Sequence, residues 1–391
     1  MPSLPALDAL RAAVADRHPR YLAELERLVN IDCGSYTPDG VNAVATFAAD
    51  ALRALGADVA RIPHAPIDGA RQLGDLVVGR IDGEGPRLLL IGHMDTVFEE
   101  GTAAERPYRV KGGRAYGPGV TDMKAGLLAG LHAVAALQAV GGAPRVTFVC
   151  NPDEEIGSPF STPVIRNLAA EHDVALVLEC ARANGDIVSA RKGIADAVAI
   201  FRGRAAHAGI EPEKGRNAVL AAAHATIAIH ALNGRWPTAT LNVGTVQGGT
   251  RPNVVAERAE LQIDLRARGG EELDAAWQAV AALVAEPAIA DVTATLERTA
   301  FHPPMERSVA AERLVALAQR LAGELGFTVN DAATGGASDA NTTAAAGLAT
   351  LDGLGPIGGD DHSPSEWLDL ESVVRRTTLL AALMLHADEA L

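Results

Sequence analysis

The stretch RLLLIGHMDTVF, residues 87–98, joins an uninterrupted apolar run to a group of polar residues. The run Leu88–Ile91 has no polar position, which predicts a short strand buried on both faces, as in a parallel or mixed sheet covered by helices. Gly92 follows the run, and His93 and Asp95 come directly after it. Because the polar residues begin where the strand ends, we expect them at the carboxyl edge of the sheet, where open α/β sheets bind their ligands.

Similar apolar runs recur along the chain and alternate with helical segments. Further strands are expected at Leu76–Ile81, Val146–Cys150 and Val174–Leu178. Helices are expected from about Pro5 to Val29, at Val41–Leu55, at Asp122–Val140, at Ser308–Leu325 and from Leu370 to about His386. This alternation predicts an α/β domain with a mixed sheet and helices on both of its faces.

The pattern changes after Arg191. The sequence then predicts, in order, a strand at Ala195–Arg204, a helix at Gly215–Leu232, strands at Ala239–Gln247 and Asn253–Arg266, a helix at Glu271–Ala285 and a strand at Asp291–Thr299. The order β-α-β-β-α-β is typical of a ferredoxin-like sandwich. We therefore predict a catalytic domain of residues 1–190 and 303–391, into which a small α+β lid and dimerisation domain of residues 191–302 is inserted.

The composition limits the classes of protein to which the chain can belong. The chain has 391 residues, of which 48 % are hydrophobic and 21 % charged, enough for two cores. A formal charge of −15 argues against a nucleic-acid partner. No apolar run approaches a membrane span, and charged residues interrupt the N-terminal segment, so we expect neither a membrane partner nor a secretion signal. The cysteines, Cys33, Cys150 and Cys180, are scattered and odd in number, which favours a reducing compartment and a cytoplasmic location.

Further polar residues follow predicted strands or stand in glycine turns. They are Asp122 in GPGVTDMK (residues 117–124), Glu154 and Glu155 in NPDEEIG (residues 151–157), Glu179 after the run Val174–Leu178, and His362 in GDDHSPSEW (residues 359–367). A carboxylate such as Asp122 can bridge two cations. Two adjacent glutamates can divide the work, because one can bind a metal while its neighbour acts as a general base.

Imidazole and carboxylate ligands without thiolates suit a catalytic zinc site, with cobalt or manganese as substitutes. His93 can offer one ring nitrogen to a metal while Asp95 accepts the hydrogen of the other. Each residue alone has an ordinary interpretation, since a lone histidine is more often a core residue, an aspartate a helix cap and a glutamate pair a solvated loop. Their occurrence in order at strand ends and glycine turns favours one site for two ions about 3.5–4 Å apart.

The segments GHMDTVF, GPGVTDMKAG and PDEEIGS together resemble a di-zinc metallopeptidase family, and the resemblance covers nearly the whole chain. That family includes glutamate carboxypeptidases, aminoacylases, acetylornithine deacetylases and succinyl-diaminopimelate desuccinylases. The resemblance implies two zinc ions per chain, one held by His93, Asp122 and Glu179 and the other by Asp122, Glu155 and His362. It also implies that Asp95 orients His93 and that Glu154 is the general base.

The same resemblance implies substrate contacts in the lid and beside it. His207 would reach an active site across a dimer and stabilise the oxyanion, and Asn253 and Arg266 would bind the carbonyl and the carboxylate of the substrate. Gly336 and Ser338 would belong to a glycine-rich substrate loop. The fork of Arg266 suits a carboxylate, although an ordinary arginine on the sheet surface would occupy the same polar face. A homodimer through the lid follows from the resemblance alone.

These observations predict a metal-dependent hydrolase that releases a C-terminal amino acid, of the glutamate type, from an N-acyl or peptidyl substrate. Within the family that the chain resembles, a glutamate at position 179 is typical of the branches whose substrates carry a free carboxylate. An N-acyl-amino-acid deacylase of the acetyl or succinyl type stays open as an alternative. A catalytically silent metal-binding relative is a third, which Asp95, Glu154 and His207 disfavour.

Overall fold

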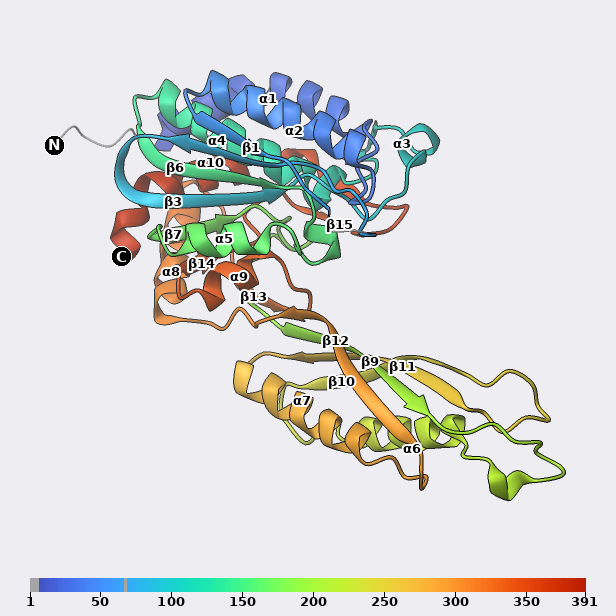
Figure 1. The fold of residues 1–391 in the computed structure, drawn as a ribbon. Coiled ribbons are helices and arrows are strands. Elements are labelled where there is room, and N and C mark those ends of the chain that lie inside the picture. Colours follow the sequence, from blue (N-terminus) through green and yellow to red (C-terminus); the bar gives the residue numbers. More distant parts are fainter. Residues whose placement is uncertain (1–6, 67–68) are drawn as a thin grey trace. The chain divides into compact units, whose positions relative to one another are not determined.

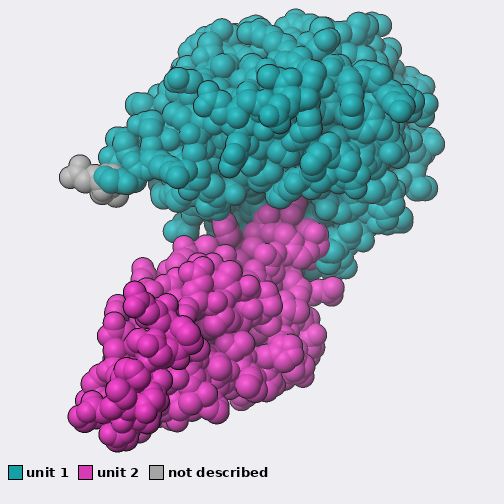
Figure 2. Space-filling view, turned by 90° about the vertical axis from the view of Figure 1, so that its right-hand side faces the viewer, with its two compact units in different colours: residues 1–189, 307–333, 338–391 teal, residues 190–306, 334–337 magenta. Residues whose placement is uncertain are grey.

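The computed structural model describes residues 7–66 and 69–391. It consists of two compact units, which Figure 2 colours separately. Unit 2 comprises Ala190–Glu306 and Thr334–Ala337, and unit 1 comprises the other described residues. Unit 2 extends past residue 302, where the lid was predicted to end, because Met305 still exchanges backbone hydrogen bonds of 3.0 and 3.1 Å with Arg191.

Unit 1 is built on a six-stranded mixed sheet. In spatial order its strands are β1 (Asp58–Ile62), β2 (Leu76–Ile81), β6 (Pro144–Asn151), β3 (Glu84–His93), β7 (Val174–Val177) and β14 (Ala349–Leu351). β6, β3, β7 and β14 run parallel, whereas β1 and β2 pair antiparallel with their neighbours. The strands predicted for this domain all lie in the sheet, which confirms the α/β class.

The run Leu88–Ile91 lies in β3, between β6 and β7. Its four side chains are at most 1 % exposed. Because successive side chains of a strand point to opposite faces, burial of all four requires cover on both sides of the sheet. Figure 1 shows this cover, with α1, α2, α4 and α10 over one face and α5 and α9 along the other. Each buried leucine contributes about 1.5–3 kcal/mol to the stability of this core.

The helical segments of unit 1 are α1 (Leu7–Val29), α2 (Pro38–Ala54), α3 (Thr102–Glu105), η1 (Val120–Ala125), α4 (Gly126–Ala139), η2 (Glu154–Ile156), α5 (Thr162–Ala169), α8 (Val309–Glu324), α9 (Asp339–Ala345), α10 (Leu370–His386) and η4 (Ala387–Ala390). The five helices predicted for unit 1 are present with shifted ends, as α1, α2, α4, α8 and α10, and the other helical segments of this unit were not predicted. The predicted start of the first helix, Pro5, lies outside the described residues. α2 begins at Pro38 rather than at Val41 because the fixed φ of proline suits the first helical position.

One apolar segment is longer than the sequence analysis expected. Val120–Ala139 is long and apolar enough to cross a membrane, with a mean hydropathy of 1.2. However, 94 % of its most apolar stretch is buried inside the protein. α4 in this segment packs against α1 and α10. It is therefore a core helix of unit 1.

Short strands complete unit 1 and were not predicted, because they are too short to show a periodic pattern. A four-stranded sheet holds, in spatial order, β15 (Gly358–Gly359), β16 (Trp367–Asp369), β5 (Arg114–Tyr116) and β4 (Arg109–Lys111). β8 (Ile187–Arg191) and β13 (Asp331–Thr334) form a two-stranded sheet where the chain passes between the units. The loop between β15 and β16 carries His362.

Unit 2 has the predicted order of elements. They are β9 (Gly193–Arg202), η3 (Pro212–Lys214), α6 (Ala218–His230), β10 (Thr240–Gly248), β11 (Arg258–Ala267), α7 (Gly270–Ala285) and β12 (Thr293–His302). The sheet order β10-β11-β9-β12 is that of a ferredoxin-like sandwich. β11 begins at Arg258 rather than at Asn253, because Pro252 cannot donate a ladder hydrogen bond and the chain turns there.

Candidate metal centre

Three parallel strands bring polar residues to one edge of the sheet in unit 1. β3 ends at His93, β6 ends at Asn151 just before Glu154 and Glu155, and Glu179 follows the end of β7. His93 and Asn151 are register partners across β3 and β6. Because parallel strands have their carboxyl ends at the same edge, the residues that follow them meet there.

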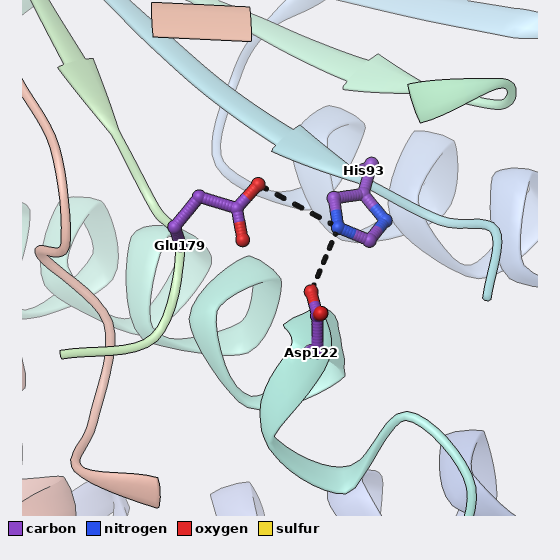
Figure 3. A group of neighbouring side chains, drawn as sticks. All are labelled: His93, Asp122 and Glu179. Carbon is purple, nitrogen blue, oxygen red and sulfur yellow. Dashed lines mark hydrogen bonds and ion pairs between the residues drawn. The ribbon is translucent and has the colours of Figure 1, made fainter. Parts of the chain in front are cut away.

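His93, Asp122 and Glu179 form a first group of ligands, which we call the sheet subsite (Figure 3). His93 Nε2 lies 3.1 Å from Asp122 Oδ1 and 3.6 Å from Glu179 Oε1. Figure 3 shows the three side chains turned toward one another, from the end of β3, from the turn before α4 and from the segment after β7. The imidazole is only 1 % exposed, so this group is enclosed by the core of unit 1.

Asp122, Glu155 and His362 form a second group, which we call the loop subsite. His362 Nε2 lies 3.1 Å from Asp122 Oδ2 and 3.2 Å from Glu155 Oε2. Glu155 belongs to the turn η2, and His362 belongs to the loop between β15 and β16. The His362 side chain is 55 % exposed. Asp122 therefore presents one carboxylate oxygen to each subsite and stands between them.

Asp122 does not begin a helix, although the sequence predicted that it would. α4 begins at Gly126, and Asp122 lies in the preceding turn η1 with a φ of −109° and a ψ of 96°. The apolar periodicity of residues 126–139 is helical, but this irregular turn leaves no periodic signal in the sequence. The backbone N–H groups of the turn need other acceptors, and the carboxylate of Glu366 is one of them. No role was predicted for Glu366.

Asp95 supports both His93 and the glutamate pair. His93 Nδ1 lies 2.9 Å from the Asp95 carbonyl oxygen and 3.5 Å from its carboxylate, so the predicted contact is made mainly by the backbone. A carbonyl can only accept, which puts a proton on Nδ1 and leaves Nε2 facing the sheet subsite. The Asp95 carboxylate instead accepts the backbone N–H groups of Glu154 and Glu155 at 3.1 Å and the Ser35 hydroxyl at 2.6 Å.

A buried polar network lies behind the loop that carries the glutamate pair. Asn151 and Ser158 each donate a hydrogen bond of 2.6 Å to the carboxylate of Asp339. The Ser161 hydroxyl lies 2.5 Å from Asp153 Oδ1 and 2.8 Å from Asn151 Oδ1 and can donate to one of them at a time. This network was not predicted, because Asp339 is 188 residues away from Asn151 along the chain. Its effect is to hold η2 at the edge of the sheet.

The neighbouring charges shift the pKa values of the ligands. Hydrogen bonds to Asp122 and Glu155 raise the pKa of His362 to about 11. Burial alone would lower the pKa of His93, but Glu179 and Asp122 outweigh it and raise that pKa well above its usual value. Burial alone would raise the pKa of Asp122, but its hydrogen bonds to the two histidines hold it below the usual range. Without metal, protons on the histidines balance the carboxylates, and divalent cations can take their place.

The donor atoms fit two divalent metal ions. Within each subsite the ligand atoms lie within 4.8 Å of one another. Tetrahedral ligands at about 2.0–2.1 Å from zinc would be about 3.3 Å apart, which is close to the distances of 3.1–3.6 Å across both subsites. The buried Oε1 atom of Glu155 has no hydrogen-bond partner among the described residues. A cation would supply the partner that this oxygen lacks.

Two predicted substrate residues, His207 and Asn253, lie side by side in unit 2. The backbone of His207 pairs with Val254, and the N–H of Ala208 donates to the Asn253 carbonyl at 3.0 Å. Both side chains are exposed. His207 Nδ1 accepts the N–H of Gly209 at 3.2 Å. Their roles at a substrate stay predictions.

Arg266 contacts the glycine-rich loop. It lies on the polar face of β11, opposite the buried side chains of Leu261 and Leu265. Its Nε donates to Asp264 at 3.0 Å, and its Nη1 donates to the Gly335 carbonyl at 2.9 Å. The fold therefore brings Arg266 beside the loop that contains Gly336. Their roles at a substrate stay predictions.

Ser338 ends the glycine-rich segment and lies at the start of α9. It caps the first turn of α9 and is 3 % exposed. Its hydroxyl donates to Asp352 at 2.7 Å and accepts the N–H of Ala340 at 3.1 Å. The structure thus gives Ser338 a capping role, and its predicted substrate contact stays a prediction. The Gly-Gly-Ala-Ser-Asp segment contains both a glycine turn and a helix cap, and the sequence alone did not separate the two.

Known proteins match nearly the whole chain. The sequence pattern of Peptidase family M20/M25/M40 matches residues 89–386. Carboxypeptidase G2 of Pseudomonas sp. (strain RS-16) is 31 % identical over 384 residues, which cover 97 % of this chain and 92 % of that protein. Succinyl-diaminopimelate desuccinylase of Gluconacetobacter diazotrophicus is 28 % identical over 375 residues, covering 90 % and 93 %. The structure of aminopeptidase PepT from Bacillus cereus has a TM-score of 0.77 at 24 % identity, with 95 % and 98 % of the chains covered.

Proposed function

The chain belongs to Peptidase family M20/M25/M40, a family of metal-dependent hydrolases of amide bonds, and from this premise we propose that it releases a C-terminal amino acid of the glutamate type from an N-acyl or peptidyl substrate. One observation carries the proposal. The carboxylate of Asp122 offers one oxygen to each of two ligand groups, so the chain has the donors for a bridged pair of metal ions.

The proposed ions are two zinc ions per chain, with cobalt or manganese as substitutes. His93, Asp122 and Glu179 would hold one ion, and Asp122, Glu155 and His362 would hold the other. Zinc bound there would supply Lewis-acid polarisation of the scissile carbonyl and would make a water more acidic. Asp95 serves both ions, because it orients His93 and holds the backbone of Glu155.

Glu154 is the proposed general base. Its backbone N–H is held by Asp95 at 3.1 Å, and its carboxyl is close enough to His93 and Glu179 for their charges to act on it. Burial raises the pKa of Glu154, which brings its basicity closer to that needed for proton transfer near neutral pH. It takes the proton of the attacking water and returns it to the leaving nitrogen. A silent metal-binding protein has no use for such a base.

The preference for a free carboxylate on the substrate is supported by Arg266. Its guanidinium can bind a planar anion through two N–H groups. Asp264 and the Gly335 carbonyl occupy this fork here, so a substrate carboxylate would take the place of Asp264. Asn253 is proposed to bind the substrate carbonyl and His207 to stabilise the oxyanion. Gly336 lies beside the Arg266 contact and is proposed to line the same substrate loop.

An N-acyl-amino-acid deacylase is the second candidate. It uses the same metal centre and base and differs only in the acyl group and the leaving amino acid. The match to a succinyl-diaminopimelate desuccinylase over 90 % of this chain favours it specifically. Both candidates act on small N-acyl amino acids, so a panel of substrates separates them.

A homodimer through unit 2 is the proposed assembly. The helix α6 exposes several apolar side chains, among them Ile227, which is 70 % exposed. β10 lies at the edge of the four-stranded sheet of this unit. An exposed apolar helix face beside a strand edge is typical of a surface that another chain covers. Light scattering should therefore give the mass of a dimer for the wild type and of a monomer for Ile227→Glu, whereas a monomeric wild type would contradict the proposal.

The test of the activity uses zinc-loaded protein and three substrates, benzoyl-glutamate, acetyl-ornithine and succinyl-diaminopimelate. The Glu154→Gln variant is assayed alongside, with the exposed Glu171→Gln as a matched control. We expect glutamate release by the wild type and the control, and a loss of about 100- to 10,000-fold in Glu154→Gln with both zinc ions retained.

Each other outcome has a distinct meaning. Loss of zinc from Glu154→Gln would show that Glu154 is a ligand rather than the base. Hydrolysis of the acetyl or succinyl substrate alone would favour the deacylase. Hydrolysis of none of the three by protein that holds two zinc ions would contradict both candidate functions and leave the metal centre in place.

A further inference from the structure

Glu366 is not a member of either ligand group, yet its carboxylate is bonded to the turn that carries Asp122. The residue is 1 % exposed. Its Oε2 accepts the N–H of Gly119 at 2.9 Å, and its Oε1 accepts the N–H groups of Thr121 and Asp122 at 2.8 and 3.1 Å. Buried carboxylates need such partners. One side chain therefore fixes three backbone positions of the turn, including that of the bridging ligand itself.

The turn depends on this acceptor because it is not helical at Asp122. The dihedral angles of Asp122 (φ −109°, ψ 96°) and Met123 (φ −128°, ψ 38°) interrupt the helical hydrogen-bond pattern. Backbone N–H groups that lose their helical acceptor must find another one when they are buried. Glu366 provides it. The direction of the Asp122 side chain follows from its backbone, so Glu366 helps to aim both carboxylate oxygens.

Glu366 also closes the loop that carries His362. The loop spans residues 360–366 and joins β15 to β16, which pair antiparallel through Gly358–Leu368 and Gly359–Trp367. His362 has a positive φ of 61° and an exposed side chain, so packing alone holds it weakly. The hairpin lies directly on the Asp122 turn, because a Cβ atom on Gly358 would come within 1.9 Å of Thr121 Oγ1.

We propose that Glu366 is a positioning residue that sets the distance between His362 and Asp122 and thereby holds the second zinc ion in the loop subsite. The inference rests on the proposed two-zinc centre, but not on the identity of the substrate. The sheet subsite has an independent support, because His93 ends β3 and Glu179 follows β7. Loss of the Glu366 carboxylate should therefore weaken one subsite much more than the other.

The experiment replaces the carboxylate with the amide of the same size, Glu366→Gln. The amide keeps one acceptor oxygen and turns a donor group toward backbone N–H groups, so part of the turn loses its acceptor. The exposed Glu371→Gln on α10 is the matched control. The affinity for each zinc ion is measured by competition with a chelator. Visible spectra of cobalt-loaded protein and hydrogen exchange of residues 117–125 report on the geometry of the centre and on the turn.

The expected result is selective. We expect the affinity for the second zinc to fall about 10- to 100-fold, the usual effect of removing a residue that orients metal ligands. The first zinc should lose much less affinity because it keeps His93 and Glu179. One of the two cobalt signals should be lost, and the turn should exchange faster. The control should match the wild type in every measurement.

Several results would overturn the proposal. Equal weakening of both ions, with faster exchange throughout unit 1, would mean that Glu366 supports the fold in general. Unchanged affinities would mean that His362 and Asp122 are held by other contacts. If Glu366→Gln does not fold, Glu366→Asp keeps the charge with a shorter reach. If Glu366→Asp folds and binds both zinc ions as tightly as the wild type, the proposal is contradicted. Failure of both variants to fold would also contradict a role confined to one subsite.

The same experiment separates this inference from the proposed function. A wild type that binds two zinc ions and hydrolyses no acyl amino acid, while Glu366→Gln loses the second ion, would disprove the activity and support the inference. A wild type that binds only one zinc ion would disprove the metal centre and the inference together.

Discussion

The two subsites share Asp122 and the same kinds of donor, but the fold builds them in different ways. In the sheet subsite, His93 ends the central strand β3 and Glu179 follows its neighbour β7, and the imidazole is 1 % exposed. In the loop subsite, Glu155 lies in a short turn and His362 in a loop, and that imidazole is 55 % exposed. The two subsites therefore have the same kinds of ligand, but strands hold one set and loops hold the other. We expect the sheet subsite to bind its ion more tightly.

The largest effect that sharpens this comparison comes from removing one histidine at a time. His93→Ala should lower the zinc affinity of the sheet subsite by more than about 100-fold, because losing a ligand costs more than losing a residue that orients one. It should also lower the thermal stability of metal-free protein, because it leaves a cavity in the core. His362→Ala should empty the loop subsite alone and leave that stability unchanged. Zinc content after dialysis and thermal melts of the metal-free proteins test the two variants. Loss of both ions from His362→Ala would mean that the subsites are not separable.

Asp95→Asn should give the next largest effect and should act on both subsites. Its carboxylate accepts the N–H groups of Glu154 and Glu155 and lies 3.5 Å from His93 Nδ1. An amide can replace only part of this pattern, so we expect zinc affinity and kcat to fall about 10- to 100-fold. Asp50→Asn, an exposed change on α2, is the control. An effect on the sheet subsite only would contradict the role of this carboxylate in holding the turn of Glu154 and Glu155.

A pH series should give a smaller effect, of about tenfold in affinity per pH unit for each proton displaced. Asp122 and Glu155 raise the pKa of His362 to about 11, so the metal-free imidazole is protonated at neutral pH. Zinc requires the neutral ring, and it must therefore displace this proton. Affinity for the loop subsite should rise with pH until about pH 11. Calorimetry in buffers of different ionisation enthalpy counts the protons released, and a count of zero at neutral pH would contradict the raised pKa.

The fold was predicted where burial and periodicity decide it. The run Leu88–Ile91 identified the central strand, and the alternation of Leu261, Ile263 and Leu265 identified β11 in the ferredoxin-like unit. Residues named from the sequence also come together at the sheet edge around Asp122: His93, Asp95, Glu154, Glu155, Glu179 and His362. The predicted start of the helix at Asp122 was wrong, because α4 begins at Gly126. Each of these features depends on residues that are neighbours in the chain.

The supports of the centre could not be predicted, because their partners are far apart in the chain. Glu366 meets Thr121 across 245 residues, and Asp339 meets Ser158 across 181 residues. The capping role of Ser338 depends on the exact start of α9, which periodicity does not define. The cytoplasmic location and the absence of nucleic-acid and membrane partners stay predictions from composition.

The central claim is a two-metal centre bridged by Asp122, and X-ray diffraction from zinc-loaded crystals at the zinc absorption edge tests it most directly. We predict two anomalous peaks about 3.5–4 Å apart, one between His93 and Glu179 and the other between Glu155 and His362, with one oxygen of Asp122 directed to each. A single peak, or two peaks that do not share Asp122, would contradict the account.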